Sequence, residues 1–135
     1  LDYLVIDLPP GTGDVQLSLV QKVPVHSAVV VTTPQNISLI DAKKAIDMFE
    51  RTNVKIAGIV ENMSHMLNPA NGEKIQLFPK GELDGYLDAK KLTKLTEIPF
   101  NPSVSLGSEA GVTIVESNSS GVEAQAFKTL AAKLK

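Results

Sequence analysis

Short apolar runs alternate along the chain with stretches in which apolar residues recur every three or four positions. The runs suit strands buried on both faces, and the spaced positions suit helices with one apolar side. The predicted strands cover residues 4–6, 27–33, 55–61 and 95–98. The predicted helices cover residues 14–23, 38–52, 83–92 and 122–134. Because strands and helices alternate with short connections, we expect an α/β fold in three layers, with a mostly parallel sheet and helices on both faces.

Local signals refine several of these boundaries. Asp14 can cap the first helix, and Ser38 with Asp41 has capping-box spacing at the start of the second. A loop-rich insertion precedes residues 74–78, which we interpret as a hairpin strand. Near the C-terminus, a glycine-punctuated loop is expected as far as Gly111, followed by a short strand at residues 113–115.

Composition narrows the classes of partner. A chain of 135 residues that is 43% hydrophobic fits one domain with a core. Its 13 basic and 15 acidic residues give a formal charge of −2, which indicates neither nucleic acid nor an anionic membrane as partner. There is no cysteine to form a disulfide or to ligate a cluster. No apolar run is long enough to span a bilayer and there is no signal region, so we expect a cytoplasmic protein.

The loop after the first predicted strand carries the most specific chemistry. In parallel sheets, ligands bind beyond the carboxyl ends of the strands. Asp7, at such an end, is placed to hold a magnesium ion, and Gly11 lets a backbone N–H approach a terminal phosphate. The alternative is a simple turn in which Asp7 caps a neighbouring backbone group.

The string from Ile6 to Asp14, Ile-Asp-Leu-Pro-Pro-Gly-Thr-Gly-Asp, resembles the Walker B and switch II segment of the Mrp/ApbC family of iron-sulfur cluster carriers. This family belongs to the MinD, ParA and nitrogenase-iron-protein group of P-loop ATPases. Further matches follow in the family's order over nearly the whole chain, at residues 31–35, 41–42, 58–64, 97–99 and, more loosely, 107–111. The resemblance implies a MinD-like P-loop NTPase fold, ATP and magnesium as cofactors, and a homodimer as the full-length protein.

The same resemblance assigns roles to five residues. It implies that Asp7 lies by the magnesium of the nucleotide and that Gly11 senses the terminal phosphate as a switch. Asn62 would hydrogen-bond adenine, and Pro99 and Phe100 would lie in the loop that packs near the base. From the residues alone, Asn62 and Pro99 are equally well explained as residues that end strands.

Two of the chain's departures from the family bear on its function. Asn68 and Asn71 stand where many members have the two cysteines of Cys-Pro-x-Cys, and an amide is a poor ligand for a cluster. No Gly-x-x-x-x-Gly-Lys-Ser/Thr loop occurs either. We therefore expect residues 1–135 to be the C-terminal portion of a single P-loop ATPase domain with an incomplete N-terminal half, inactive by itself.

Three functions remain open from the sequence. The first is an Mrp-type protein that binds and hydrolyses ATP and acts in iron-sulfur cluster assembly or transfer, with recipient proteins as partners. The second is a cysteine-less ATPase that serves as a regulatory or partner-binding switch without a cluster, and the third is an interaction module without nucleotide chemistry. Asn68 and Asn71 favour the second over the first, whereas the intact string from Asp7 to Asp14 opposes the third.

Overall fold

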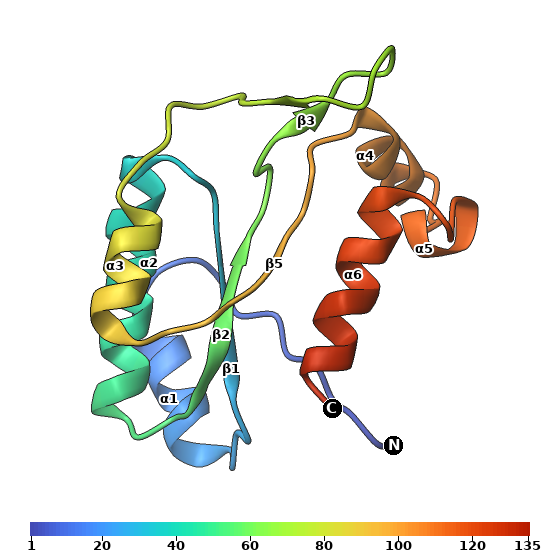
Figure 1. Ribbon diagram of the computed structural model, residues 1–135. Helices are drawn as coiled ribbons and strands as arrows, with labels where there is room; N and C mark the ends of the chain where they lie inside the picture. The colour runs from blue at the N-terminus through green and yellow to red at the C-terminus, as the bar shows by residue number, and fades with distance from the viewer.

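A three-stranded parallel sheet forms the middle layer of the computed structural model, which describes residues 1–135 (Figure 1). Its strands are β1 (Ala28–Thr32), β2 (Ile56–Glu61) and β5 (Lys94–Glu97), with β2 in the centre. Val30 pairs with Ile59 across the first two strands, and Val60 pairs with Thr96 across the second pair. The predicted parallel sheet and three of its four predicted strands are therefore confirmed.

Helices cover both faces of the sheet (Figure 1). One face carries α1 (Asp14–Lys22), α2 (Asn36–Arg51) and α3 (Leu83–Lys90), and the other carries α6 (Val122–Lys133). The predicted α/β class with three layers is confirmed. None of the helices is both long enough and apolar enough to cross a membrane.

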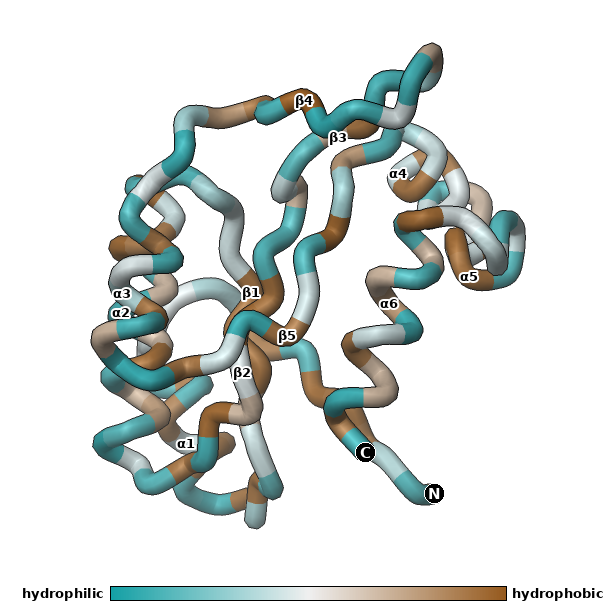
Figure 2. The backbone as a smooth tube through the Cα atoms, in the orientation of Figure 1, coloured by the Kyte–Doolittle hydropathy of each residue, from teal (hydrophilic) through white to brown (hydrophobic).

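The two sides of the sheet bury very different amounts of apolar surface. The larger core joins α1, α2 and α3 to the sheet and contains 12 buried residues, among them Ile46, Phe49 and Ile59. A smaller core beneath α6 is formed by Val60, Ile98 and Ala126. In Figure 2 the hydrophobic stretches of the sheet lie in its middle, around β1 and β2, whereas hydrophobic and hydrophilic residues alternate along the helices. Burial against the sheet thus holds the helices, mainly on the α2 side.

Both predicted helix caps are wrong. Asp14 is the first residue of α1 and Gly13 is its N-cap, without a side-chain hydrogen bond. Gln35 is the N-cap of α2, so Ser38 and Asp41 lie inside the helix. The helix begins two residues before the predicted start at residue 38, because the Gln35 carbonyl already accepts the backbone N–H groups of Ser38 and Leu39.

The insertion after β2 forms a small antiparallel hairpin of β3 (Met66–Leu67) and β4 (Lys74–Ile75). The predicted hairpin strand at residues 74–78 is therefore confirmed only for its first two residues.

The segment between β5 and α6 is helical, contrary to prediction. The expected glycine-punctuated loop contains α4 (Pro102–Glu109). Its N-cap is Asn101, whose side chain accepts a hydrogen bond from the Ser103 backbone N–H. The expected strand at residues 113–115 is replaced by α5 (Ile114–Ser117), whose N-terminus carries a complete capping box between Thr113 and Glu116. These two caps satisfy backbone donors locally, and this outweighs the β propensity of the short Val-Thr-Ile-Val run.

The strand predicted at residues 4–6 does not form. The side chains of Leu4 and Val5 are 72% and 91% exposed. The segment pairs with no strand of the sheet, and an extended apolar run without a neighbour has no partner for its backbone groups. The edge of β1 that faces away from β2 is also unpaired, and Val31 on this strand is 63% exposed. Both chain ends lie close together at the lower right of Figure 1.

Candidate functional site

The loop between residue 8 and α1 is held from the helix side by one buried side chain. Gln16, in the first turn of α1, is only 4% exposed. Its amide nitrogen donates hydrogen bonds to the carbonyl oxygens of Pro9 at 2.7 Å and Pro10 at 3.0 Å. Gly11 then adopts a φ of +96°, which strongly favours glycine. The conformation of this loop is therefore held by the Gln16 side chain as well as by the two prolines.

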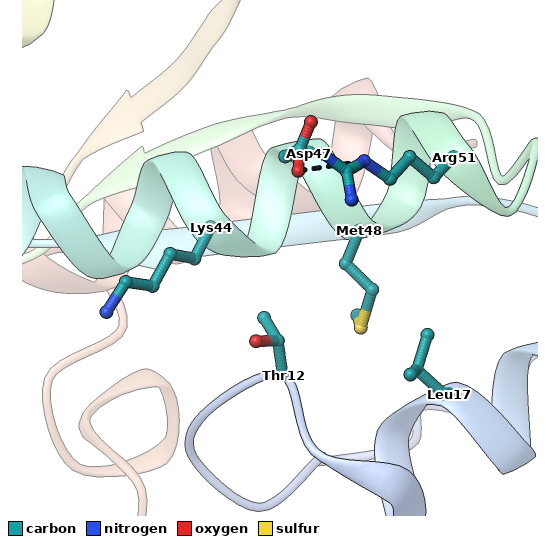
Figure 3. Close-up of a pocket in the computed structure, with 6 residues that line it drawn as sticks. All are labelled: Thr12, Leu17, Lys44, Asp47, Met48 and Arg51. Atoms are coloured by element: carbon teal, nitrogen blue, oxygen red, sulfur yellow. Dashed lines mark ion pairs between the residues drawn. The ribbon is translucent and has the colours of Figure 1, made fainter.

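A cavity of about 200 Å³ lies between this loop and α2 (Figure 3). Its lining residues are Thr12, Leu17, Lys44, Asp47, Met48 and Arg51. Met48 points from α2 toward Thr12 and Leu17, while Asp47 and Arg51 form an ion pair of 3.1 Å on the same helix. The loop thus lies against α2, with Lys44 as an exposed cation beside it.

A second part of the site lies beyond the ends of β2 and β5. The Ser64 backbone N–H donates to the Ile98 carbonyl at 3.1 Å, and the Phe100 N–H donates to the His65 carbonyl at 2.7 Å. These bonds join the segment that starts at Asn62 to the one that contains Pro99. Both segments therefore lie at the edge of the sheet formed by the carboxyl ends of its strands, where parallel α/β proteins bind ligands.

The side chains at this edge differ in exposure. Pro99 is buried, whereas Phe100 is 39% exposed. Asn62 is half-buried, and its backbone N–H donates to the Thr32 carbonyl at 2.7 Å. No side-chain polar atom in the protein is both buried and unpaired. The Asn62 amide, which takes part in none of the side-chain hydrogen bonds, is therefore within reach of solvent or a ligand.

A charged cluster that the sequence did not reveal lies beneath this edge, on the α3 side. The Lys94 ammonium group pairs with the carboxylates of Glu61, Asp84 at 2.6 Å and Glu97 at 3.1 Å. The side chains of Lys94 and Glu61 are only 19% and 10% exposed. The cluster borders a cavity of about 300 Å³ that is also lined by Ser64 and His65. Lys94 therefore ties the ends of two strands to α3.

This cluster shifts the pKa values of its members. Burial alone would lower the pKa of Lys94, but its hydrogen bonds to Asp84, Glu61 and Glu97 raise that pKa overall. For Glu97, burial alone would raise the pKa, but the hydrogen bond and charge of Lys94 lower it overall. Both groups are thus held in their charged forms.

The shifts predict a stability maximum between the two titrations. The stabilisation from Glu97 is complete at pH values above the usual glutamate pKa of 4.5. It is lost as pH falls through the lowered pKa of Glu97 in the folded protein. The stabilisation from Lys94 is complete below 10.5 and is lost as pH rises through its raised folded pKa. We expect the melting temperature to fall on both sides of this window, and Glu97→Gln to reduce the fall on the acid side. An acid limb identical in Glu97→Gln and wild type would contradict the assignment.

The tip of the β3–β4 hairpin uses its asparagines in turns. The Asn68 side-chain oxygen accepts the Ala70 backbone N–H at 2.9 Å, and the Asn71 oxygen accepts the Glu73 N–H at 3.0 Å. These are asparagine turns of the ordinary type. No group of three or more His, Cys, Asp or Glu side chains that could hold a metal ion occurs in the structure.

The structure brings together only part of the predicted site. Asn62, Pro99 and Phe100 share one edge of the sheet. Asp7 and Gly11 belong to the separate loop before α1, where Asp7 is exposed and takes part in no ion pair. None of these five residues lines either cavity described above. Their five roles stay predictions.

Comparison with known protein families identifies the family of this chain. The model of the ParA family described as NUBPL iron-transfer P-loop NTPase matches residues 1–135. The chain therefore belongs to this family of P-loop NTPases.

Individual proteins similar to the chain are consistent with this family assignment. The chain is 44% identical over 131 residues to an iron-sulfur cluster carrier protein of Aquifex aeolicus, covering 97% of this chain and 36% of the relative. It is 40% identical over 134 residues to the iron-sulfur cluster transfer protein NUBPL of Mus musculus, covering 99% of this chain and 42% of the relative. The chain thus spans about two fifths of the length of these relatives.

Solved structures show the same fold. A nucleotide-binding protein of Archaeoglobus fulgidus in complex with ADP matches with a TM-score of 0.71 and 41% identity, over 82% of this chain and 46% of that one. The cell division ATPase MinD of Pyrococcus furiosus also matches with a TM-score of 0.71, at 23% identity, over 98% of this chain and 51% of that one. The MinD-like P-loop fold predicted from the sequence is confirmed.

Proposed function

We propose that residues 1–135 form the C-terminal portion of a P-loop domain that binds and hydrolyses ATP in iron-sulfur cluster assembly or transfer. The observation that carries this proposal is the loop from Pro9 to Gly13, which the buried Gln16 side chain holds. Gly11 within the loop and Asp7 before it are both exposed. A loop fixed by these hydrogen bonds, with an exposed glycine and an unpaired carboxylate just before it, suits a phosphate and its metal ion. The relatives named above are called cluster carrier and cluster transfer proteins.

The residues present fit magnesium and a nucleotide. Asp7 offers a carboxylate without a competing cation, Gly11 offers a backbone N–H, and Asn62 offers a free amide with both a donor and an acceptor for a base edge. Magnesium, when bound, neutralises charge on the phosphates during transfer. Within the chain, Asp7 would hold the ion, Gly11 would contact the terminal phosphate, and Asn62, Pro99 and Phe100 would hold the base.

The main phosphate anchor has to come from outside these residues, because no glycine-rich lysine loop occurs among them. β1 has an unpaired edge, and the apolar side chains of residues 1–6 are exposed. Both features support the proposal that another part of the complete protein packs against β1 and residues 1–6. We therefore propose that the 135 residues alone are inactive and that the complete protein is the ATPase, acting as a homodimer in the cytoplasm.

Equilibrium titration of the complete protein with ATP and ADP in the presence of magnesium tests the nucleotide proposal. We expect both nucleotides to bind, and light scattering to show a dimer with ATP. A complete protein that binds neither nucleotide would exclude the proposed ATPase.

The chain lacks the usual ligand of an iron-sulfur cluster. A cluster needs thiolate ligands above all, and the chain contains no cysteine. Asn68 and Asn71 have their side-chain oxygens engaged in turns. This observation favours a second candidate function, a nucleotide-dependent switch that binds or regulates a partner protein without carrying a cluster.

Anaerobic reconstitution with iron and sulfide distinguishes the two functions. We expect the Asn68→Ala, Asn71→Ala double variant of the complete protein to bind as much iron and sulfide as the wild type, because neither asparagine acts as a ligand. A wild type that binds no cluster would favour the switch over the carrier. Loss of a cluster in the double variant alone would show that the hairpin tip does ligate it.

A further inference from the structure

We propose that Gln16 is a positioning residue that aims the backbone N–H of Gly11 at the terminal phosphate of the nucleotide. The proposal rests on the proposed function and names a residue to which neither the sequence nor the family comparison assigned a role. It is carried by the two hydrogen bonds of the Gln16 side chain and by the geometry of the peptide unit that they hold.

The Gln16 side chain is committed to the loop. It is 4% exposed, and its NH₂ group donates to Pro9 at 2.7 Å and to Pro10 at 3.0 Å. An amide nitrogen carries two hydrogens, so both donors are used on successive carbonyl groups. A buried amide that lost these partners would pay the full cost of desolvation, and this keeps the two carbonyl groups turned toward α1.

Fixing the Pro10 carbonyl also fixes the next N–H. The bond between Pro10 and Gly11 is trans, and in a planar trans peptide the C=O and N–H groups point in opposite directions. Because the Pro10 oxygen points at Gln16, the Gly11 N–H points away from Gln16 and α1. Neither Pro9 nor Pro10 has an N–H group, so Gly11 supplies the first backbone donor of the loop.

The Gly11 N–H is free to bind a ligand. Gly11 is exposed, and its N–H takes part in none of the backbone hydrogen bonds outside the helices and strands. Its φ of +96° and the empty space around its Cβ position leave the approach to this donor open. An outward-facing backbone donor in a fixed loop is what a phosphate oxygen requires.

The test compares the affinities of the complete protein for ADP and for a non-hydrolysable ATP analogue, both with magnesium. Gln16→Met keeps the length of the side chain but removes both donors, and Gln16→Glu keeps its shape while replacing the NH₂ group by an acceptor. Gln21→Met serves as the matched control, because Gln21 is exposed on the same helix and makes no side-chain hydrogen bond.

We expect both Gln16 variants to bind the ATP analogue about 10- to 100-fold more weakly, the effect of one hydrogen bond to a charged group, while their affinity for ADP stays the same. The Gln21→Met variant should bind both nucleotides like the wild type. Retained ADP binding shows that the variants are folded, and a purely structural role of Gln16 would not change the ratio of the two affinities.

Two results would overturn the proposal. Either the affinities for ADP and the ATP analogue fall by the same factor in both Gln16 variants, or neither affinity changes. If the wild type itself binds no nucleotide, the proposed function fails and this inference fails with it, so the two failures are told apart by the wild-type titration.

Discussion

The Asp7→Asn variant of the complete protein is expected to hydrolyse ATP at least about 100-fold more slowly than the wild type. Removing the charge of a magnesium ligand costs several kcal/mol of transition-state stabilisation, and each 1.36 kcal/mol lowers the rate by about a factor of ten. The substitution keeps the size of the side chain and removes only its charge. Steady-state phosphate release under saturating ATP measures the effect.

Asp2→Asn is the matched control for this experiment. Asp2 lies in the same exposed N-terminal segment, five positions before Asp7, and has no ion-pair partner either. Its replacement should leave turnover unchanged. Turnover by Asp7→Asn within twofold of the wild type would remove Asp7 from the magnesium site.

Lys94→Met should destabilise the protein far more than the removal of an exposed lysine does. It leaves Glu61, whose side chain is 10% exposed, without its cation, and it separates the carboxylates of Asp84 and Glu97 from their shared partner. Removing one partner of a largely buried ion pair costs about 2–3 kcal/mol at this degree of exposure. For the complete P-loop domain, which is larger than these 135 residues, that corresponds to a fall of roughly 5–10 °C in melting temperature, measurable by calorimetry.

Two further variants identify the cause. Lys90→Met removes an exposed lysine that pairs with Glu50, and we expect it to change the melting temperature little. The double variant Glu61→Gln, Lys94→Met should recover part of the loss, because it removes the buried charge together with its partner. A double variant less stable than Lys94→Met alone would show that Glu61 is stabilised by something other than Lys94.

The sheet could be predicted because its strands carry their own signal. β1 and β2 contain apolar runs around Val30 and Ile59, and such runs can be recognised without knowledge of distant residues. In β5 only Leu95 is a buried apolar residue. The segment at residues 4–6 shows the same pattern but forms no strand, because a strand also requires a partner for its backbone. Pattern alone therefore identifies a candidate strand and not its pairing.

The errors at the helix ends have a local cause. Thr113 and Glu116 have the spacing of a capping box, and this signal was present in the sequence, although the neighbouring β-branched residues suggested a strand. Ser38 and Asp41 have a similar spacing, yet α2 starts at Asn36, directly after the turn that ends β1. A capping motif predicts a helix start only where the chain has not already turned into the helix.

The parts of the candidate site formed by residues adjacent in sequence could be predicted, and those formed by residues distant in sequence were missed. The string from Asp7 to Asp14 and the segment around Asn62 were recognised from the sequence itself. The cluster around Lys94 joins residues from two strands and α3, and only Glu61, a carboxylate ending an apolar strand, hinted at it. Gln16 gave no signal, since a glutamine in the first turn of a helix is ordinarily exposed.

The central claim is that the loop before α1 and the edge beyond β2 and β5 together form one nucleotide site. Amide hydrogen exchange of the complete protein, with and without magnesium and a non-hydrolysable ATP analogue, tests this claim most directly. We predict slower exchange on binding in three segments, residues 7–13, 62–65 and 98–101. Nucleotide binding that slows exchange in only one of the two parts of the site, or in neither, would contradict the account.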